Sequence, residues 1–319
     1  MPEENNDQIL LFAIIQVIIS IGYTLLLFLV VYPLVDFTFL GYTLGIINPQ
    51  LIVYILPNFL NILFFIILAK MSLKELGFPG DKTWKGLLIA IGIIFLAEIC
   101  KLIINIALGI RPLFFSQWTE TIFITQTIGN WIGELFGNSL FEEILYRAIL
   151  FPQLYIFFKR KEVFDKNLFN GLLALGTSQV IFALIHIPSR IIGFGFSIWD
   201  TVLSLLILFG MGWIFAAVYF VTESLLASMI IHGWYNIIFF NIFTPYSTSV
   251  EQIIRVVITL IVIISYYLIK RFLVLPQQQE PTVSSAPTAP SQEQKITNSQ
   301  TFKQEPVEQE KNTEEEFLL

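Results

Sequence analysis

The feature that most constrains the fold of this chain is a series of long apolar segments separated by polar stretches. The sequence of 319 residues is 55% hydrophobic and only 13% charged. An apolar stretch of about 20 residues is long enough to cross a bilayer as a helix. Eight such segments can be recognised, at about residues 9–32, 49–70, 84–109, 121–151, 171–186, 201–221, 224–243 and 251–272. The sequence therefore predicts an all-α fold, a polytopic bundle of about eight transmembrane helices.

The distribution of Lys and Arg predicts how this bundle is oriented. Basic residues are concentrated at 70–85, at 159–166 and at 270–271, whereas the intervening loops are sparse in them. Cytoplasmic loops carry the excess of Lys and Arg in membrane proteins. With eight spans the three basic regions fall on one side, which predicts that both termini are cytoplasmic. The first apolar segment follows an acidic start, so we interpret it as a retained helix and not as a cleaved signal peptide.

Composition divides the chain into three predicted regions: 1–119 with about three spans, 120–275 with about five, and 276–319 as a tail. The formal net charge is −6, and the eight Glu and three Lys of the tail account for −5 of it. Gln, Glu, Pro, Ser and Thr dominate the tail, a composition typical of disorder. The membrane part is close to neutral, so charge gives no indication of nucleic-acid binding. The sequence does not identify a partner for the tail.

Two adjacent glutamates and an arginine interrupt the fourth apolar segment, at Glu142, Glu143 and Arg147. Each such charge costs about 2.5–3.5 kcal/mol at the centre of a membrane helix on insertion scales, so it is retained only where it is paired or functional. Residues four apart share a helix face, so Glu143 can reach Arg147. Glu142 points about 100° away and lacks that partner. The pattern predicts one neutralised carboxylate and one that can act as a base or an acid.

Both histidines of the protein, His186 and His232, also lie in apolar segments, and Asn236 follows His232 by one helical turn. Polar side chains at this depth face the interior of a bundle. We therefore expect Glu142, His186, His232 and Asn236 to meet in one pocket. A carboxylate with an imidazole can activate water, and an imidazole N–H with an amide can hold an oxyanion. Alternatively, Glu142 and both histidines could hold zinc with an open position.

Structural explanations compete with each of these assignments. His232 and Asn236 could only join helices, and Glu98 with Lys101 is expected to be a structural pair. Glu134 is expected at the edge of its span, in contact with water. No HExxH pattern is present, which disfavours a zincin-type site, and the single Cys100 excludes a cysteine-based metal site.

Three motifs in the chain resemble those of the CPBP family of intramembrane proteases, also called ABI proteins, which includes CAAX proteases and bacteriocin-processing enzymes. The Glu-Glu-x-x-x-Arg motif matches Glu142, Glu143 and Arg147. The Phe-x-x-x-His motif matches Phe182 and His186, and the His-x-x-x-Asn motif matches His232 and Asn236. The resemblance covers about residues 120–243, and the first three spans and the tail lie outside it.

The resemblance implies an intramembrane endopeptidase in which Glu142 and His186 activate water, while His232 and Asn236 stabilise the oxyanion. Glu143 and Arg147 then orient and neutralise the helix, and Phe182 supports the site. The family is described both as metalloproteases and as glutamate-dependent enzymes. We favour a glutamate-activated water and no required cofactor, because Asn is a poor zinc ligand, but zinc on Glu142, His186 and His232 stays an alternative.

Two other functions are compatible with the sequence. A non-catalytic member could serve as a membrane scaffold or immunity factor, and intramembrane Glu and His also mark ion-coupled transporters. The absence of a clear internal repeat weighs against transport. For a protease, the partners are the lipid bilayer and a membrane-associated substrate, such as a prenylated CAAX protein, a leader peptide or a membrane-anchored regulator.

Overall fold

The computed structural model describes residues 3–47, 49–67, 70–78, 80–109, 121–163, 167–237 and 248–271. These residues form helices and turns without a strand, which confirms the all-α prediction. The predicted tail at 276–319 lies outside the described residues. In chain order the α-helices are α1 (Glu3–Leu26), α2 (Tyr32–Leu34), α3 (Pro49–Ile67), α4 (Gly80–Ala107), α6 (Thr121–Ile132), α7 (Leu140–Glu143), α8 (Phe151–Arg160), α9 (Asn167–Leu184), α10 (Ile198–Thr222), α11 (Leu225–Asn236) and α12 (Thr248–Ile269).

Five helical segments among the described residues are long and apolar enough to cross a bilayer. They are Gln8–Leu34, Lys82–Ala107, Asn167–Gly193, Ile198–Thr222 and Gln252–Ile269. Each overlaps a span predicted from the sequence, so the chain is an integral membrane protein. The shorter apolar helix Leu51–Ile67 corresponds to the predicted second span. The count of eight, the cytoplasmic termini and the division at residue 120 stay predictions.

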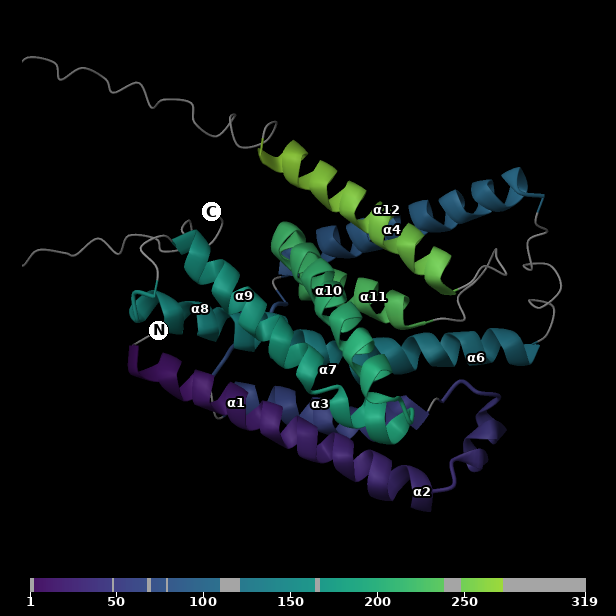
Figure 1. Ribbon diagram of the computed structural model, residues 1–319, viewed down its shortest axis with the longest axis horizontal. Coiled ribbons are helices and arrows are strands. Elements are labelled where there is room, and N and C mark those ends of the chain that lie inside the picture. The colour runs from purple at the N-terminus through teal and green to yellow at the C-terminus, as the bar shows by residue number, and fades with distance from the viewer. Residues whose placement is uncertain are drawn as a thin grey trace, which may run out of the picture. The chain divides into compact units, whose positions relative to one another are not determined.

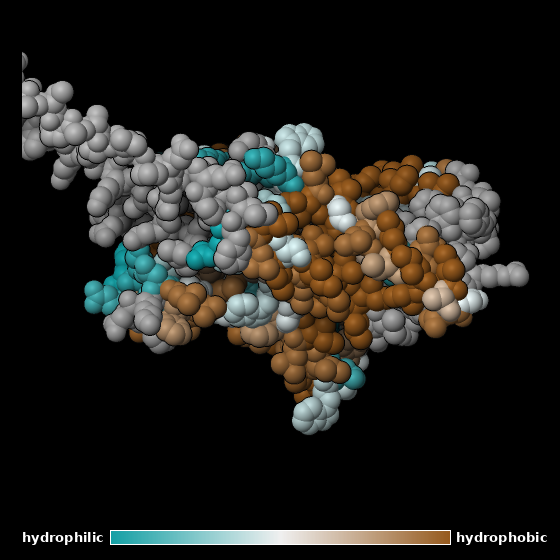
Figure 2. All heavy atoms as spheres, turned by 90° about the horizontal axis from the view of Figure 1, so that it is seen from above, coloured by the Kyte–Doolittle hydropathy of each residue, from teal (hydrophilic) through white to brown (hydrophobic). Residues whose placement is uncertain are grey.

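The first helix shows how the chain distributes apolar and polar residues between lipid and interior. Its buried face is formed by Ile9, Ala13, Gln16 and Ser20, spaced three or four apart, whereas large side chains such as Ile18 point outward and are exposed. Apart from Ile9, this arrangement places small and polar groups inside, as expected where the solvent is lipid. Figure 2 shows apolar side chains gathered over much of the face in view.

The helical run from residue 121 to 160 is continuous but not uniform. Between its α-helical parts lie two π-helical segments, η3 (Gly133–Ser139) and η4 (Ile144–Leu150), which flank the four residues of α7. A π-helical segment inserts an extra residue per turn and often marks a functional site. It also leaves carbonyl groups to be satisfied from elsewhere. Asn58 of α3 donates through Nδ2 to the carbonyls of Phe136 and Gly137, both at 2.6 Å.

Helix α11 is short and almost completely enclosed, because ten of its twelve residues are buried. The Ser224 side chain caps its first turn by accepting the backbone N–H of Ala227 at 3.3 Å. Twelve residues are too few to span a bilayer, and such a length is typical of a buried core helix or a re-entrant segment. The predicted seventh span ran on to residue 243, and its part beyond residue 237 lies outside the described residues.

The far end of α11 is closed by α12. Arg255, which is fully buried, donates to the carbonyls of Trp234, Tyr235 and Ile237. The last carbonyls of a helix have no partner within it, so this arginine supplies their missing donors.

The core helices belong to one compact unit, residues 1–268. Figure 1 shows α11 between the neighbouring helices α10 and η3. Helix α3 packs against η3 and α7, and α4 packs along the other side of α11. The α4 contact is close at Gly86, where a Cβ atom would lie 2.3 Å from the Cβ of Ser224. These contacts bring α7, α9 and α11, the three helices that carry or adjoin the sequence motifs, around one interior region.

Candidate active site

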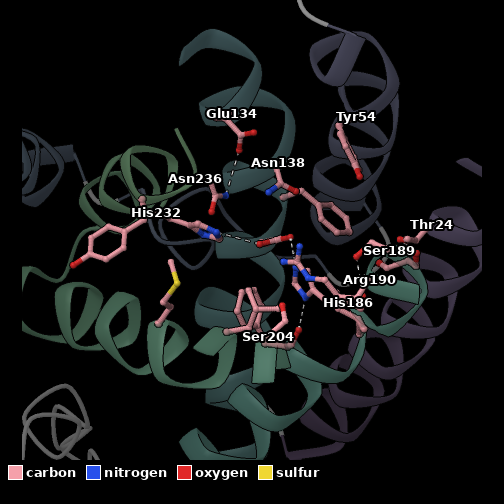
Figure 3. Close-up of a pocket in the computed structure, with 18 of the residues that line it drawn as sticks. Thr24, Tyr54, Glu134, Asn138, His186, Ser189, Arg190, Ser204, His232 and Asn236 are labelled. Atoms are coloured by element: carbon pink, nitrogen blue, oxygen red, sulfur yellow. Dashed lines mark hydrogen bonds and ion pairs between the residues drawn. The ribbon is translucent and has the colours of Figure 1, made fainter. Parts of the chain in front are cut away.

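A cavity of about 560 Å³ lies where these helices meet. This volume is in the range of small-molecule and peptide sites, about 300–1,000 Å³. Its lining includes all four residues predicted to be catalytic, namely Glu142, His186, His232 and Asn236. Side chains of α1 and α3, such as Thr24 and Tyr54, form another part of the wall (Figure 3). The cavity therefore combines the motif-bearing helices with N-terminal helices that carry none of the motifs.

The carboxylate of Glu142 lies between the two imidazole rings. Its Oε1 is 3.4 Å from Nε2 of His186, and its Oε2 is 3.3 Å from Nε2 of His232. Glu142 is only 5% exposed, and its Oε2 has no hydrogen-bond partner among the described residues. The two N–O distances exceed those of tight charge-assisted hydrogen bonds, about 2.7–2.9 Å. The carboxylate thus faces the cavity with acceptor capacity left over.

The orientation of His186 is fixed from its own helix. Its Nδ1 lies 2.7 Å from the carbonyl oxygen of Phe182, one turn earlier, and the Phe182 ring meets it edge-on with centroids 5.0 Å apart. A carbonyl oxygen only accepts, so we assign the proton to Nδ1. Nε2 of His186 is therefore the nitrogen available to Glu142 or to a bound water.

His232 is fixed in the same way by a different acceptor. Its Nδ1 donates to Oε1 of Glu143 at 2.7 Å, and its ring stacks on Phe215 with centroids 4.3 Å apart. The adjacent glutamates therefore hold one imidazole from two edges, Glu143 at Nδ1 and Glu142 at Nε2. Both histidines turn Nε2 toward the same carboxylate.

Glu143 is the most heavily supported charge of the site. Its Oε2 lies 3.4 Å from Nε of Arg147, and it accepts a hydrogen bond from Ser228 Oγ at 2.5 Å. Arg147 in turn lies over the Phe182 ring, with Cζ 4.7 Å from the centroid, and reaches the Gly212 carbonyl at 3.4 Å. The predicted Glu143–Arg147 pair is thus present. The sequence did not indicate the bond to His232, although Ser228 shares a helix face with that histidine.

Asn236 lines the cavity beside Glu134. Its amide nitrogen lies 3.2 Å from Oε2 of Glu134, a side chain of η3 (Figure 3). Glu134, which was expected at an edge in contact with water, is half-buried, lines the cavity and contacts Asn236. An amide group has two N–H donors, so one is left for a ligand.

The alternative assignment of a zinc ion to Glu142, His186 and His232 can be compared with this geometry. Within the described ranges, no group of three or more His, Cys, Asp and Glu side chains is arranged to hold a metal ion. The donor set of the prediction is present, but its arrangement does not form a recognisable metal site. We derive no step through a metal.

Comparison with known families agrees with the motif assignment. Residues 124–238 match the family model described as Type II CAAX prenyl endopeptidase Rce1-like. The match includes all of the motif residues from Glu142 to Asn236 and confirms the predicted resemblance over this part of the chain. No curated protein and no solved structure gives a significant match to the chain. The N-terminal helices that wall the cavity lie outside the matched residues.

Proposed function

We propose that the protein is an intramembrane endopeptidase that hydrolyses a peptide bond of a membrane-associated substrate, with a prenylated CAAX-type chain as the first candidate. The observation that carries the proposal is the position of Glu142, whose two carboxylate oxygens each face an imidazole Nε2 in the wall of a cavity. The Rce1-like match over the same residues supports a CAAX-type protease. Surrounding helices with apolar outer faces suit a substrate that is delivered from the bilayer.

In the proposed mechanism Glu142 is the general base. A water molecule held by Glu142 and Nε2 of His186 gives its proton to the carboxylate as its oxygen attacks the scissile carbonyl. The carbonyl π electrons move to its oxygen, which becomes a tetrahedral oxyanion. The protonated Glu142 then gives its proton to the departing amine nitrogen as the C–N bond breaks and the carbonyl re-forms. The two products are a carboxylic acid and an amine, and Glu142 returns to its initial state.

Donors for the oxyanion come from α11. His232 can donate through Nε2 only when it is an imidazolium, because its Nδ1–H is already given to Glu143. A donor at Nε2 faces the position where negative charge develops on the substrate. The second donor is the amide N–H of Asn236 that is not used by Glu134.

The experiment that tests the proposal is cleavage in proteoliposomes by purified wild-type protein and by Glu142→Gln. Three substrate classes are compared: a prenylated CAAX peptide, its unprenylated form, and a leader-type peptide. We expect wild-type protein to cleave the prenylated peptide and Glu142→Gln to bind it without cleaving it. Absence of cleavage of every substrate by a folded wild-type protein would contradict the proposal and favour a scaffold or immunity role.

A further inference from the structure

One charged side chain in the cavity wall has no part in the proposed chemistry. Arg190 belongs to the π-helical turn η5 (Ser189–Gly193), which follows directly after His186 in the chain. Its backbone N–H donates to the carbonyl of His186 at 3.0 Å, so the two residues are held one turn apart. Figure 3 shows Arg190 beside His186 and Ser189 in the wall, and Glu134 in a different part of it.

The guanidinium of Arg190 makes no hydrogen bond in the described part of the chain, and the charge of Glu142 acts on it only through space. Its Cζ lies 5.1 Å from the ring centroid of Phe194, which supports one face of the group. Its Nε is buried without an acceptor, and no described carboxylate forms an ion pair with it. A buried charged donor without an acceptor is costly, and such groups are normally satisfied by a partner, water or a ligand.

The two buried arginines, Arg147 and Arg255, also have guanidinium nitrogens without a hydrogen-bond partner, but unlike the half-buried Arg190 each makes other polar contacts among the described residues. Arg147 contacts the carboxylate of Glu143, and Arg255 contacts three carbonyls at the end of α11. Both therefore hold parts of the protein together. Arg190 makes no such connection through its side chain and lines the cavity instead. Its positive charge therefore faces any ligand that binds in the cavity.

We propose that Arg190 binds the C-terminal carboxylate of the peptide substrate. The inference rests on the proposed protease function, which supplies a peptide as the occupant. The planar guanidinium fork matches a carboxylate by two parallel N–H···O bonds. Elsewhere in the cavity Glu134 and Glu142 repel a carboxylate, so Arg190 is the place where one is stabilised. This fixes the direction of the peptide, with its chain end at η5 and its scissile bond at Glu142.

Helix geometry gives a rough distance between cleavage site and chain end. Four residues of helix separate Arg190 from His186, a rise of about 6 Å. An extended peptide covers about 3.3 Å per residue. The subsite is therefore expected to favour cleavage a few residues from the C-terminus over cleavage at internal peptide bonds.

The test is a two-by-two comparison of substrate and enzyme. Wild type and Arg190→Gln are assayed on one lipidated peptide with a free C-terminal carboxylate and on the same peptide with a C-terminal amide. Loss of a charged hydrogen-bonded contact corresponds to about 10- to 100-fold in rate. We expect kcat/KM to fall by that factor when Arg190 is replaced or when the peptide carries a C-terminal amide. The variant acting on the amide peptide should show no further fall. Arg160→Gln, an exposed arginine at the end of α8, is the matched control and keeps the wild-type preference.

A binding measurement makes the result independent of turnover. In the Glu142→Gln background, a fluorescent acid peptide is expected to bind more tightly than its amide by the same factor, and addition of Arg190→Gln removes the difference. Arg190→Lys keeps the charge without the fork, so a partial preference is expected. Thermal unfolding in detergent identifies a variant that fails to fold.

Two results overturn the inference. One is equal cleavage of acid and amide peptides by wild type, which leaves the protease function standing. The other is a loss of cleavage activity in Arg190→Gln that depends on anionic lipid and is equal for the acid and the amide peptide. That result would show that Arg190 binds a lipid headgroup. Failure of wild type on both peptides, with no binding of either, removes the proposed function and the subsite together.

Discussion

Two clusters of buried charge lie in the helices of this protein, and they differ in how they are built. On α4, Lys101 Nζ lies 2.5 Å from Glu98 Oε1, three residues earlier on the same helix. On α7, α9 and α11, Glu142 meets two imidazoles that come from different helices. Neither Glu98 nor Lys101 lines the cavity, whereas Glu142 and both histidines do.

The difference shows that burial of a charge in a membrane helix is a poor guide to function by itself. The α4 pair is local, and part of the cost of burying it is offset within one helical turn. The site around Glu142 needs three chain segments to assemble, and its carboxylate and both imidazoles line a cavity. We infer that convergence on a cavity, and not the presence of charge, distinguishes a site for chemistry from a structural pair.

The sharpest test of this comparison is Glu142→Gln. The substitution keeps size and shape but removes the base, so we expect cleavage to fall by about 100- to 10,000-fold. Helical content and detergent-solubilised thermal stability stay close to wild type, because the described contacts of Glu142 are limited to the two imidazoles. Glu162→Gln, at an exposed turn after α8, is the matched control and is expected to cleave normally. Substantial cleavage by folded Glu142→Gln would end the assignment of the base.

The next largest effect is expected at Asn236. Removal of one oxyanion donor typically lowers kcat by about 100- to 1,000-fold. Asn236→Ala should therefore lower kcat strongly and change KM little, because the donor acts mainly on the transition state. Steady-state kinetics on the prenylated peptide measure both values, and Asn167→Ala at the exposed start of α9 serves as control. A rise in KM with kcat unchanged would reassign Asn236 to substrate binding.

Substitution of Glu143 tests a residue that supports the catalytic groups of the site without reacting itself. Glu143→Gln keeps one acceptor oxygen where Ser228 and His232 now use two, and it leaves Arg147 without its buried charge partner. We expect a stability loss of about 3–5 kcal/mol from the broken pair. Activity per folded molecule should fall by about 10- to 100-fold, as for other groups that orient a functional imidazole.

The companion variant for Glu143 is Arg147→Met combined with Glu143→Gln. Removal of both charges restores part of the stability, because no uncompensated ion remains. Chemical denaturation in mixed micelles measures this recovery. If Glu143→Gln alone is as stable as wild type and as active, the residue supports neither the fold nor the histidine.

Sequence patterns anticipated the parts of the site that depend on regular helix spacing. The i, i+4 relation of Glu143 and Arg147, and the gathering of Glu142 with both histidines, follow from the rule that polar groups face the interior of a membrane bundle. The family motifs then suggested a role for each side chain. These inferences needed only the chain's own periodicity and the resemblance.

The parts that the sequence did not predict depend on contacts between distant segments. The π-helical segments η3 and η4 shift the register of their helix, and Asn58 of α3 satisfies two of the carbonyls of η3. Arg255 of α12 closes the end of α11, a contact between segments that no local pattern predicts. Glu134 enters the cavity only because η3 turns it there. Such contacts have no signature in local periodicity, so they become visible only in the folded chain.

The smallest effect on activity is expected at Glu98 and Lys101 of α4. Variants of this pair therefore test whether a buried ion pair away from the cavity is only structural. Lys101→Met alone removes the charge that pairs with the buried carboxylate of Glu98 and should cost about 3–5 kcal/mol of stability. The double variant Glu98→Gln with Lys101→Met removes both charges and should recover most of that loss. Cleavage per folded molecule should stay within about 2-fold of wild type in the double variant, because neither side chain reaches the cavity. A large fall in kcat of the stable double variant would show that the two charge clusters are coupled. In that case, the geometry of the two clusters would not be enough to distinguish a structural pair from a reactive site.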